Sequence, residues 1–479
     1  MTENTETIEK SKMPKAIPFI IGNEAAERFS FYAIRAIMPT FLVAQFFNPT
    51  ANPALTTVAE AKSNELNHLF VVFAYFMPLI GGIVADWFFG KFKVILYISL
   101  VYALGNLILA MSTHNLHAFT FGLIIIAIAA GGIKSCVSAN VGDQFDTSNQ
   151  HLLNKVYGWF YFSINAGSVL STLAIPIVYH SYGPELAFGI PGILMCIATF
   201  IFWLGRKKYV RVPPTGVKKE NFVSILWYAL IKLFSNRKGK TVWQAVGEKF
   251  SPQSIDGIQA VLRVLTVFAF TPVFWALWDQ NLSEWVLQAK KLDRHIFGIE
   301  LLPEQIQTFN PIFLISMIPV CTYGIFPFLK KIGIEATPLR KIGTGLFLTG
   351  ASFIIIALLQ EKIDAGATPS CWWQILSYLI LSFAEIMVSM TCLEYAYTHS
   401  PVSMKSTMSA LYLLGVAAGN LFVTYINDNI AGGGFFSKFT GAAYFWLFIK
   451  ILAAFFVLFI LVAKRLPEKS YINEEKHTS

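Results

Sequence analysis

The first long apolar stretch of the chain, roughly residues 17–45, carries four charged side chains. The stretch is long enough to cross a lipid bilayer, which takes about 20 residues. Each charge near the centre of a membrane helix costs about 2.5–3.5 kcal/mol on insertion scales. At about 100° per residue, Glu24, Glu27, Arg28 and Arg35 share one face of a helix. They must therefore face the protein interior or a water-filled path, unless they form a structural ion-pair cluster between helices.

Composition extends this conclusion to the whole chain. Of its 479 residues 55% are hydrophobic and only 14% are charged, whereas a soluble protein carries about 25% charged residues. We therefore expect an all-α polytopic membrane protein with about twelve spans. The predicted spans are 17–45, 67–87, 93–112, 118–139, 154–178, 185–204, 262–282, 309–329, 340–360, 372–396, 404–425 and 441–464.

The basic loops indicate how these spans are oriented. Out-and-back pairing puts both termini on the side that also holds the basic segments around Lys91, Lys330, Lys341 and Lys464. Such loops face the cytoplasm, so we expect both termini to be cytoplasmic. The expected location is the plasma membrane, or the cell inner membrane if the source is bacterial. The polar residues 1–15 are not followed by a signal-peptide pattern, so no cleaved signal is predicted.

A basic linker divides the spans into two sets of six. The expected units are a tail at 1–16, a bundle at 17–204, the linker at 205–261, a second bundle at 262–465 and a tail at 466–479. Within the linker, NFVSILWYALIKLF from Asn221 is too short to span but is typical of a helix lying at the membrane interface. The nearby Lys218 and Lys219 favour an anionic lipid surface.

Five motifs occur along the chain in a fixed order. They are E-x-x-E-R-F-x-x-Y from Glu24, GGIKSCVSANVGDQF from Gly131, FYFSINAGS from Phe160, FWALWDQ from Phe274 and SPVSMKSTMSALYLLGVAAGN from Ser400. In these motifs the chain resembles the proton-dependent oligopeptide transporter family, a branch of the major facilitator superfamily, over about residues 17–465. The resemblance implies a major facilitator fold, with about 12 transmembrane helices in two six-helix bundles.

Three further charged residues lie in apolar stretches and need partners. Lys134 is an ammonium within a run of Ile, Ala and Gly, while Asp279 and Glu385 are carboxylates in other spans. The resemblance implies two gate pairs. Arg35 and Asp279 would close the outer side, and Lys134 and Glu385 would close the cytoplasmic side. Glu24 and Glu27, or the carboxylate of a substrate, are the other expected anionic partners of Lys134.

The resemblance also assigns two sets of site residues. The proton-coupling set is Glu24, Glu27, Arg28, Asp279 and His68, and the substrate-binding set is Tyr32, Arg35, Tyr75, Lys134, Asn165, Trp275, Asn310, Glu385 and Tyr412. His68 opens the second predicted span, where a satisfied interfacial histidine is the alternative interpretation. Asn165 and Asn310 are either contacts to a peptide backbone or interhelical packing bonds.

The site charges divide between the two halves of the chain. Arg28, Arg35 and Lys134 belong to the first six spans, and Asp279 and Glu385 to the second six. A zwitterionic peptide bridges them in this interpretation, with its site near the midplane. The expected protein is a monomeric proton-coupled symporter that imports di- and tripeptides by alternating access, surrounded by lipid and without metal or cofactor.

Two rival functions share this scaffold. One is proton-coupled transport of another small solute, such as nitrate or an amino-acid-like molecule, and the other is a non-transporting nutrient sensor. Glu385 and the complete E-x-x-E-R motif favour peptides over other solutes. No nucleophile–base pair, metal spacing, phosphate loop or nucleic-acid signature is found in the sequence, so neither an enzyme nor a nucleic-acid partner is predicted.

The orientation predicts where a protease can reach the chain. An epitope tag with a protease site, inserted near Gly216 of the basic linker, should stay uncut in intact cells and be cut after lysis. The same tag near Gly366, in a predicted outer loop, should be cut without lysis. Cleavage at Gly216 in intact cells would reverse the predicted orientation.

Overall fold

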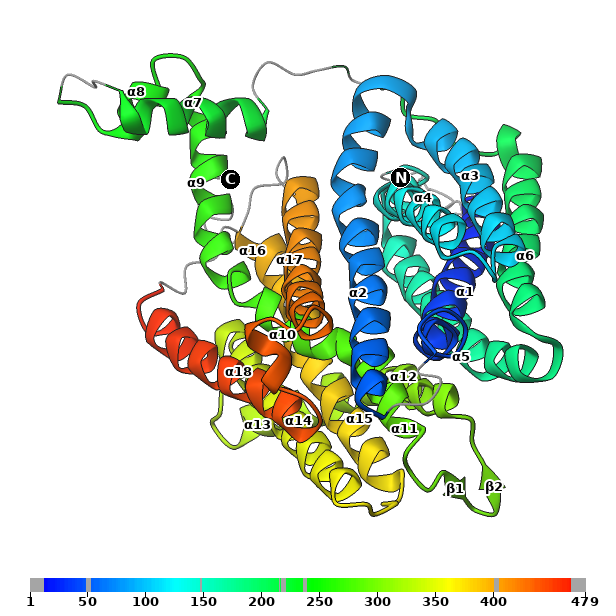
Figure 1. The fold of residues 1–479 in the computed structure, drawn as a ribbon. Coiled ribbons are helices and arrows are strands. Elements are labelled where there is room, and N and C mark those ends of the chain that lie inside the picture. Colours follow the sequence, from blue (N-terminus) through cyan, green and yellow to red (C-terminus); the bar gives the residue numbers. More distant parts are fainter. Residues whose placement is uncertain are drawn as a thin grey trace, which may run out of the picture.

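The computed structural model describes residues 13–48, 53–146, 149–214, 216, 221–235, 239–399 and 405–466. Most of the two predicted tails lies outside these residues. So do Lys218 and Lys219 of the linker and the beginning of the motif that starts at Ser400. Within the described residues the chain is mainly helical, and its helices form the two bundles drawn in Figure 1.

The first bundle contains six long helices. They are α1 (Ile17–Phe41), α2 (Pro53–Val84), α3 (Lys91–Met111), α4 (Leu116–Gly142), α5 (Leu153–Tyr182) and α6 (Pro184–Leu204). Tight turns separate α2 from α3 and α5 from α6, and Gly90 and Gly183 adopt φ of 79° and 92° there, a region that glycine enters without steric cost. The Asn115 side chain caps α4 by accepting a hydrogen bond from the backbone N–H of Ala118.

The second bundle is less regular than the first. Its elements are α9 (Pro252–Phe268), α10 (Thr271–Trp278), α11 (Glu284–Ala289), the hairpin β1 (His295–Ile296) and β2 (Ile299–Glu300), α12 (Phe309–Pro319), α13 (Phe326–Lys331), α14 (Pro338–Asp364), α15 (Trp372–Glu385), α16 (Thr391–His399), α17 (Lys405–Ala431) and α18 (Ala442–Ala463). Short π-helical segments join α12 to α13 and α15 to α16. Both therefore continue a single membrane span across a local irregularity.

Between the bundles the linker forms two helices, α7 (Phe222–Phe234) and α8 (Val242–Val246). The helix predicted from Asn221 is thus present, and the Asn221 side chain caps it by accepting from the N–H of Ser224. Figure 1 places α7 and α8 at the far end of α9, across its axis and away from the first bundle. Trp227 and Phe234 of α7 are exposed, as an interfacial helix requires.

The predicted membrane helices are confirmed in number but not in every boundary. Among the described residues eleven helices are long and apolar enough to span, or twelve if α9 and the segment Thr271–Ala289 form one span bent by 44°. That seventh span begins at Pro252, earlier than the predicted 262. The second begins near Leu55 instead of 67, because the polar segment 63–68 lowers hydropathy but continues the helix.

This longer α2 corrects the prediction for His68. The histidine does not open the span at an interface. It lies within α2 and its side chain is completely buried. A polar run was mistaken for a helix end because the sequence does not show the buried partners that satisfy those polar groups.

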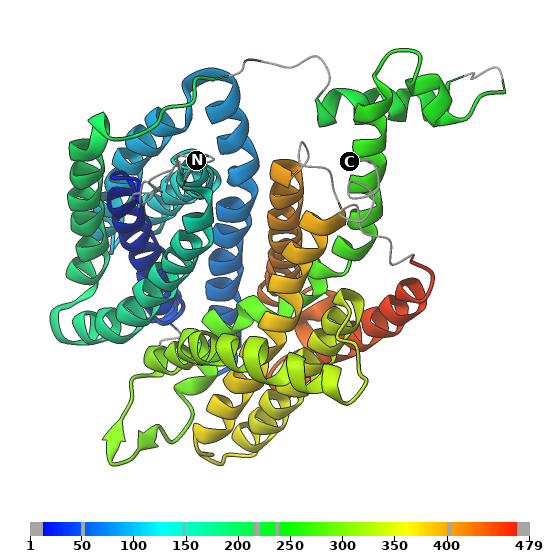
Figure 2. The ribbon, with the colours of Figure 1, turned by 180° about the vertical axis from the view of Figure 1, so that it is seen from behind.

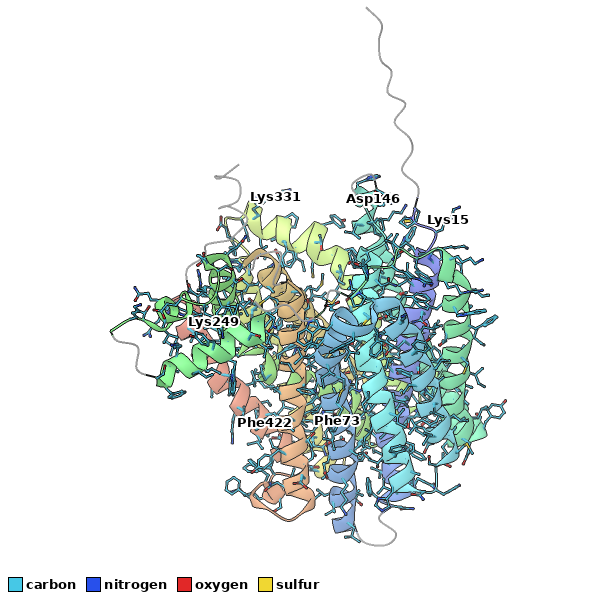
Figure 3. All side chains as sticks on the ribbon, turned by 90° about the horizontal axis from the view of Figure 1, so that it is seen from above. Lys15, Phe73, Asp146, Lys249, Lys331 and Phe422 are labelled. Carbon is cyan, nitrogen blue, oxygen red and sulfur yellow. The ribbon has the colours of Figure 1, made fainter. Side chains whose placement is uncertain are left out.

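Each bundle has its own hydrophobic core. One cluster of buried side chains contains only residues up to Tyr209, and the other contains residues from Ile225 onward together with Ala61 of α2. The bundles meet where α2 packs along α17, as Figure 2 shows from behind. Figure 3 shows Phe73 of α2 and Phe422 of α17 on either side of this seam. Two cores joined at a seam allow the halves to move as separate bodies.

Candidate functional site

The charged face of α1 lies inside the protein, as its spacing predicted. Arg28 forms ion pairs with two carboxylates of its own helix, with its Nε 3.1 Å from Glu24 Oε1 and its Nη2 in contact with Glu27 Oε2. All three residues are buried. Since α1 also packs against α5 and α6, these charges face the protein interior.

Lys134 of α4 lies against aromatic rings. Its Nζ is 3.8 Å from the ring centroid of Tyr75 and 4.1 Å from that of Phe31. A cation over such ring faces is electrostatically stabilised, yet this buried ammonium has no hydrogen-bond partner in the described part of the chain. The structure therefore leaves the three hydrogens of Lys134 available to an anion that enters the site.

The structure does not bring the expected partners of Lys134 to it. No ion pair joins Lys134 to Glu24, Glu27 or Glu385 among the described residues. The two acids of α1 are occupied by Arg28, and Glu385 has polar partners in its own bundle. The pair predicted for the cytoplasmic gate is thus unformed in this conformation.

The pair predicted for the outer gate, by contrast, is formed. Arg35 Nη1 donates a hydrogen bond to Asp279 Oδ1 at 2.7 Å, and each side chain is only 1% exposed. Arg35 belongs to α1, and Asp279 follows α10 directly in the second bundle. The contact therefore joins the two halves through a buried ion pair, for which breaking one side costs about 3–5 kcal/mol.

The buried His68 is close to this ion pair. His68 Nδ1 lies 2.7 Å from Asn420 Oδ1, and Asn420 Nδ2 donates to Asp279 Oδ2 at 2.7 Å. On its other side His68 Nε2 lies 2.9 Å from Ser283 Oγ. Asn420 and Ser283 were missed by the sequence analysis. An amide in the apolar span of α17 was the one available signal, and such residues are often only packing contacts.

A polar cavity lies between the two bundles at Glu385. Its lining includes Tyr32 and Asn165 from the first bundle and Asn310 and Glu385 from the second. Glu385 Oε2 accepts hydrogen bonds from Trp278 Nε1 at 3.0 Å and from Asn310 Nδ2 at 3.2 Å. The Asn165 side chain bonds within its own helix. The cavity thus presents a carboxylate and several amide and hydroxyl groups to a bound molecule.

The two remaining predicted site residues form one aromatic cluster beside Glu385. The ring centroid of Trp275 lies 5.1 Å from that of Trp278 and 6.2 Å from that of Tyr412. Tyr412 donates its hydroxyl hydrogen to Ser389 Oγ at 2.8 Å. Of these rings Trp278 lines the cavity and donates to Glu385, so the cluster places aromatic surface next to the carboxylate.

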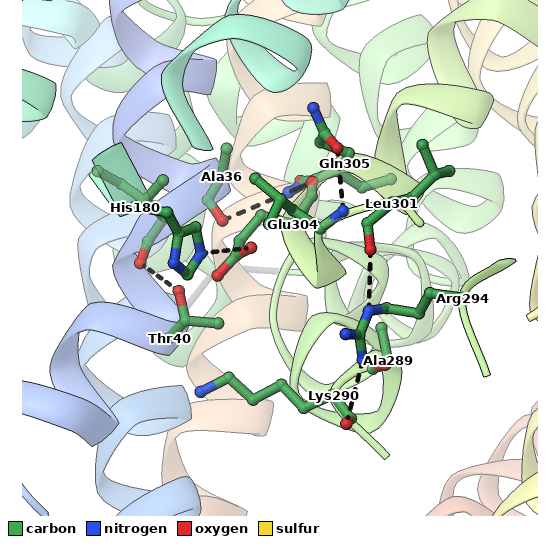
Figure 4. Close-up of polar contacts among 12 residues, drawn as sticks. Ala36, Thr40, His180, Ala289, Lys290, Arg294, Leu301, Glu304 and Gln305 are labelled. Carbon is green, nitrogen blue, oxygen red and sulfur yellow. Dashed lines mark hydrogen bonds and ion pairs between the residues drawn. The ribbon is translucent and has the colours of Figure 1, made fainter. Parts of the chain in front are cut away.

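Further polar contacts cross between the halves at the end of α5. Figure 4 shows His180 of α5 with its Nε2 3.3 Å from the carboxylate of the fully buried Glu304. Nearby, Gln305 Nε2 donates to the backbone carbonyl of Leu173 at 3.0 Å. At the end of α2, Lys291 Nζ lies 3.0 Å from Glu60 Oε1. None of these contacts was predicted, because each joins residues far apart in the sequence.

The observed arrangement defines a class of protein. Two helical bundles with separate cores enclose a charged cavity, and polar contacts join the bundles at one end while the predicted Lys134–Glu385 pair is unformed. This is the architecture of a membrane transporter of the major facilitator type. The POT family model, PTR2, matches residues 92–447, and the chain belongs to this family.

Known relatives agree with this assignment. Human solute carrier family 15 member 2 is 35% identical over 408 residues, which cover 80% of this chain and 54% of the relative. Peptide transporter 3 of Caenorhabditis elegans is 36% identical over 374 residues, or 73% of this chain and 51% of the relative. The chain thus spans about half the length of the curated relatives that it matches.

Solved structures match over nearly their whole length. The crystal structure of the POT family transporter PepTSo has a TM-score of 0.88 and 33% identity, and the alignment covers 95% of this chain and 99% of that one. An auto-inhibited POT family peptide transporter has a TM-score of 0.89 and 33% identity, covering 96% and 98% of the two chains. The major facilitator fold predicted from the sequence is confirmed.

The Arg35–Asp279 ion pair predicts how the outer ends respond to its loss. Asp279→Asn leaves the Arg35 guanidinium buried without its counter-ion, which destabilises this conformation by about 3–5 kcal/mol. A conformation that is open on the outer side relieves this penalty because water then hydrates Arg35. Spin labels at His117→Cys, in the first turn of α4, and Ala367→Cys, after α14, should therefore move apart in this variant. Electron paramagnetic resonance measures that distance, with the exposed Cys196 replaced by Ser.

The matched control is Glu394→Gln. Glu394 pairs with Lys341 at 2.8 Å within the second bundle, so its loss breaks an ion pair without touching the contact between halves. The label distance should stay at its wild-type value in this control. The same distance distribution in Asp279→Asn as in the wild type would contradict the gating role of the ion pair.

Proposed function

We propose that the protein is a proton-coupled symporter that imports di- and tripeptides by alternating access. The proposal rests on how the charged side chains between the bundles are distributed, with the basic groups on one bundle and the acidic groups on the other. Arg35 and Lys134 come from the first bundle, Asp279 and Glu385 come from the second, and the Arg35–Asp279 ion pair joins the two. Both ends of a zwitterionic peptide find a complementary charge between the halves.

Peptide binding follows from this division. The substrate carboxylate binds Lys134, whose hydrogens have no other acceptor among the described residues, with Arg35 close by. The substrate ammonium binds Glu385, and the amides of Asn165 and Asn310 accept and donate along the peptide backbone. Trp275 and Tyr412 form the apolar wall that receives a side chain. Binding then draws the two halves together.

Proton coupling acts through Asp279 in this proposal. A proton on its carboxylate removes the attraction to Arg35, and the outer ends of the bundles separate. Loss of the proton restores the ion pair and closes that side. Pairing of Lys134 with Glu385 closes the cytoplasmic side in turn. One proton moving inward through 100 mV supplies about 2.3 kcal/mol, which supports accumulation of substrate.

The setting of the transporter is part of the proposal. It works as a monomer with both termini in the cytoplasm of the plasma membrane, or of the inner membrane of a bacterium, and it co-transports protons without a bound cofactor. The relatives named as peptide transporters and the carboxylate of Glu385 support peptides over nitrate or another small solute. A substrate cavity coupled to an ion-pair gate favours transport over sensing.

The direct test is uptake of labelled dialanine into liposomes that contain the pure protein. An inward proton gradient with an inside-negative potential should drive accumulation well above that in protein-free liposomes. A protonophore should abolish this accumulation. Labelled nitrate in the same liposomes distinguishes the rival function, because accumulation of nitrate without dialanine would refute the peptide proposal.

Asp279→Asn separates coupling from binding. The amide mimics a permanently protonated acid, so uptake driven by a pH gradient should be abolished. Exchange of labelled for unlabelled dialanine without a gradient needs no net proton cycle and should survive at least in part. Arg35→Ala should weaken both processes because Arg35 also faces the substrate carboxylate. Full pH-driven accumulation in Asp279→Asn would move the coupling site to His68 or to Glu24 and Glu27.

The role of Glu385 predicts which peptides compete. Dipeptides with a free amine should inhibit dialanine uptake, and their N-acetylated forms should compete poorly, because the neutral amide cannot form an ion pair with the half-buried carboxylate. In Glu385→Gln the difference between the two inhibitors should become small. Equal competition by both forms in the wild-type protein would exclude Glu385 from amine binding.

A further inference from the structure

A buried asparagine of α17 connects the gate carboxylate to the buried histidine. Asn420 is completely buried, and its Nδ2 donates to Asp279 Oδ2 at 2.7 Å and to the Val416 carbonyl at 3.0 Å. Its Oδ1 lies 2.7 Å from His68 Nδ1. A single amide therefore contacts both titratable groups, one with each end.

The neighbours of Asn420 determine which way its amide points. A carboxylate and a backbone carbonyl only accept hydrogen bonds, so the two hydrogens of the amide must face Asp279 and Val416. The amide oxygen then faces His68 and can only accept. His68 Nδ1 must accordingly carry a hydrogen, which selects one of the two neutral tautomers of the ring.

We propose that Asn420 is a positioning residue for proton coupling, which holds His68 as its Nδ1–H tautomer so that an incoming proton binds only at Nε2. This inference rests on the proposed symport. It concerns how the proton reaches the gate, whereas the gating role of Asp279 was argued from its ion pair.

The surroundings of Nε2 suit a site that gains and loses a proton. Nε2 lies 2.9 Å from Ser283 Oγ, and the neutral ring accepts the hydroxyl hydrogen there. After a proton from water binds Nε2, the new N–H donates to Ser283 Oγ. The hydroxyl hydrogen then turns toward the carbonyl of Gln280, 3.5 Å from Oγ. Protonation therefore replaces one hydrogen bond between His68 and Ser283 by another, and both side chains keep a partner.

A polar cavity lies one residue beyond Ser283, the partner of Nε2. One helical turn before His68, Asn64 of α2 contacts Glu284, the residue after Ser283. These two residues line a polar cavity together with Glu60 and Lys291, which form an ion pair at 3.0 Å. The charged groups around His68 are thus Arg35 of α1, Asp279 and Glu284 of the second bundle, and the Glu60–Lys291 pair of this cavity. From α17 the amide of Asn420 contacts the ring.

Asn420 also makes the state of Asp279 depend on that of His68. Each oxygen of Asp279 accepts a hydrogen bond, one from Arg35 and the other from Asn420. A proton added to Oδ2 would therefore point at the N–H hydrogen of the amide and be repelled by it. When His68 is doubly protonated, its Nδ1–H still donates to the amide oxygen of Asn420. The amide therefore keeps its hydrogens directed at Asp279 and Val416. The arrangement therefore favours an ionised Asp279 while His68 carries the extra proton, and the two sites are occupied in turn.

The tautomer is measured directly by nitrogen NMR of the full-length protein labelled with ¹⁵N-histidine. The His68 signals are those that disappear in His68→Gln. At neutral pH they should report a hydrogen on Nδ1 in the wild type. In Asn420→Ala, which removes the acceptor, the Nε2–H form should appear. A wild-type Nε2–H tautomer, or an unchanged Nδ1–H tautomer in Asn420→Ala, would overturn the proposal.

Two further variants control for a general loss of structure. Asn427→Ala removes a second buried asparagine of α17 that bonds its own helix in the same way, to Val423 O at 3.0 Å, but faces Tyr444. It should leave the His68 tautomer unchanged. Ser283→Ala should also keep Nδ1–H, because the amide and not the hydroxyl selects it. Loss of Nδ1–H in Ser283→Ala would assign the selection to Ser283 and refute the role of Asn420.

Transport provides a second readout. Asn420→Ala removes one donor from the ionised form of Asp279, so the midpoint of the pH profile of proton-driven dialanine uptake should move about one unit or more toward higher pH. Asn427→Ala should keep the wild-type midpoint, and an unmoved midpoint in Asn420→Ala would contradict the link to Asp279. Because the NMR measurement needs no transport, a wild type that fails to take up dialanine refutes the proposed function and leaves the tautomer test intact.

Discussion

The ion pair between Arg35 and Asp279 is the contact on which the observed conformation depends. It connects the first helix of one bundle to the seventh span of the other, with both side chains almost completely buried. Two charges taken out of water are stable only while each satisfies the other. In the proposed mechanism the pair is a latch with two states, closed when both groups are charged and open when the carboxylate is neutral.

The rest of the fold is suited to respond to such a latch. Each bundle has its own hydrophobic core, so the apolar packing of one half does not depend on the other half. Many of the contacts that cross between them are polar, such as His180 with Glu304 and Lys291 with Glu60. Water can replace polar contacts when the halves separate, and rigid-body rocking then needs little apolar surface to be exposed.

The local geometry of the seventh span explains why the latch is found at this place. The span bends by 44° between α9 and the segment Thr271–Ala289, and Asp279 begins a 3₁₀ turn directly after α10. Irregular backbone inside a membrane protein is tolerated where it is buried or lines a cavity. Here it brings Asp279 and Ser283 to the same seam as Arg35, His68 and Asn420. The proposed coupling network thus occupies the least regular part of the second bundle.

The sequence by itself determined the class of fold, the number of membrane helices and the residues that had to be buried. Charges on one face of an apolar helix cannot face lipid, so the interior position of Arg28 and Arg35 followed from spacing and solvation cost alone. Tertiary structure decided the partners. It buried His68 in the middle of α2 and placed the ammonium of Lys134 over aromatic rings. It also connected His68 to Asp279 by hydrogen bonds through Asn420. Solvation cost depends on a residue and its near neighbours in the chain, whereas a hydrogen bond between residues more than a hundred positions apart depends on how whole helices pack.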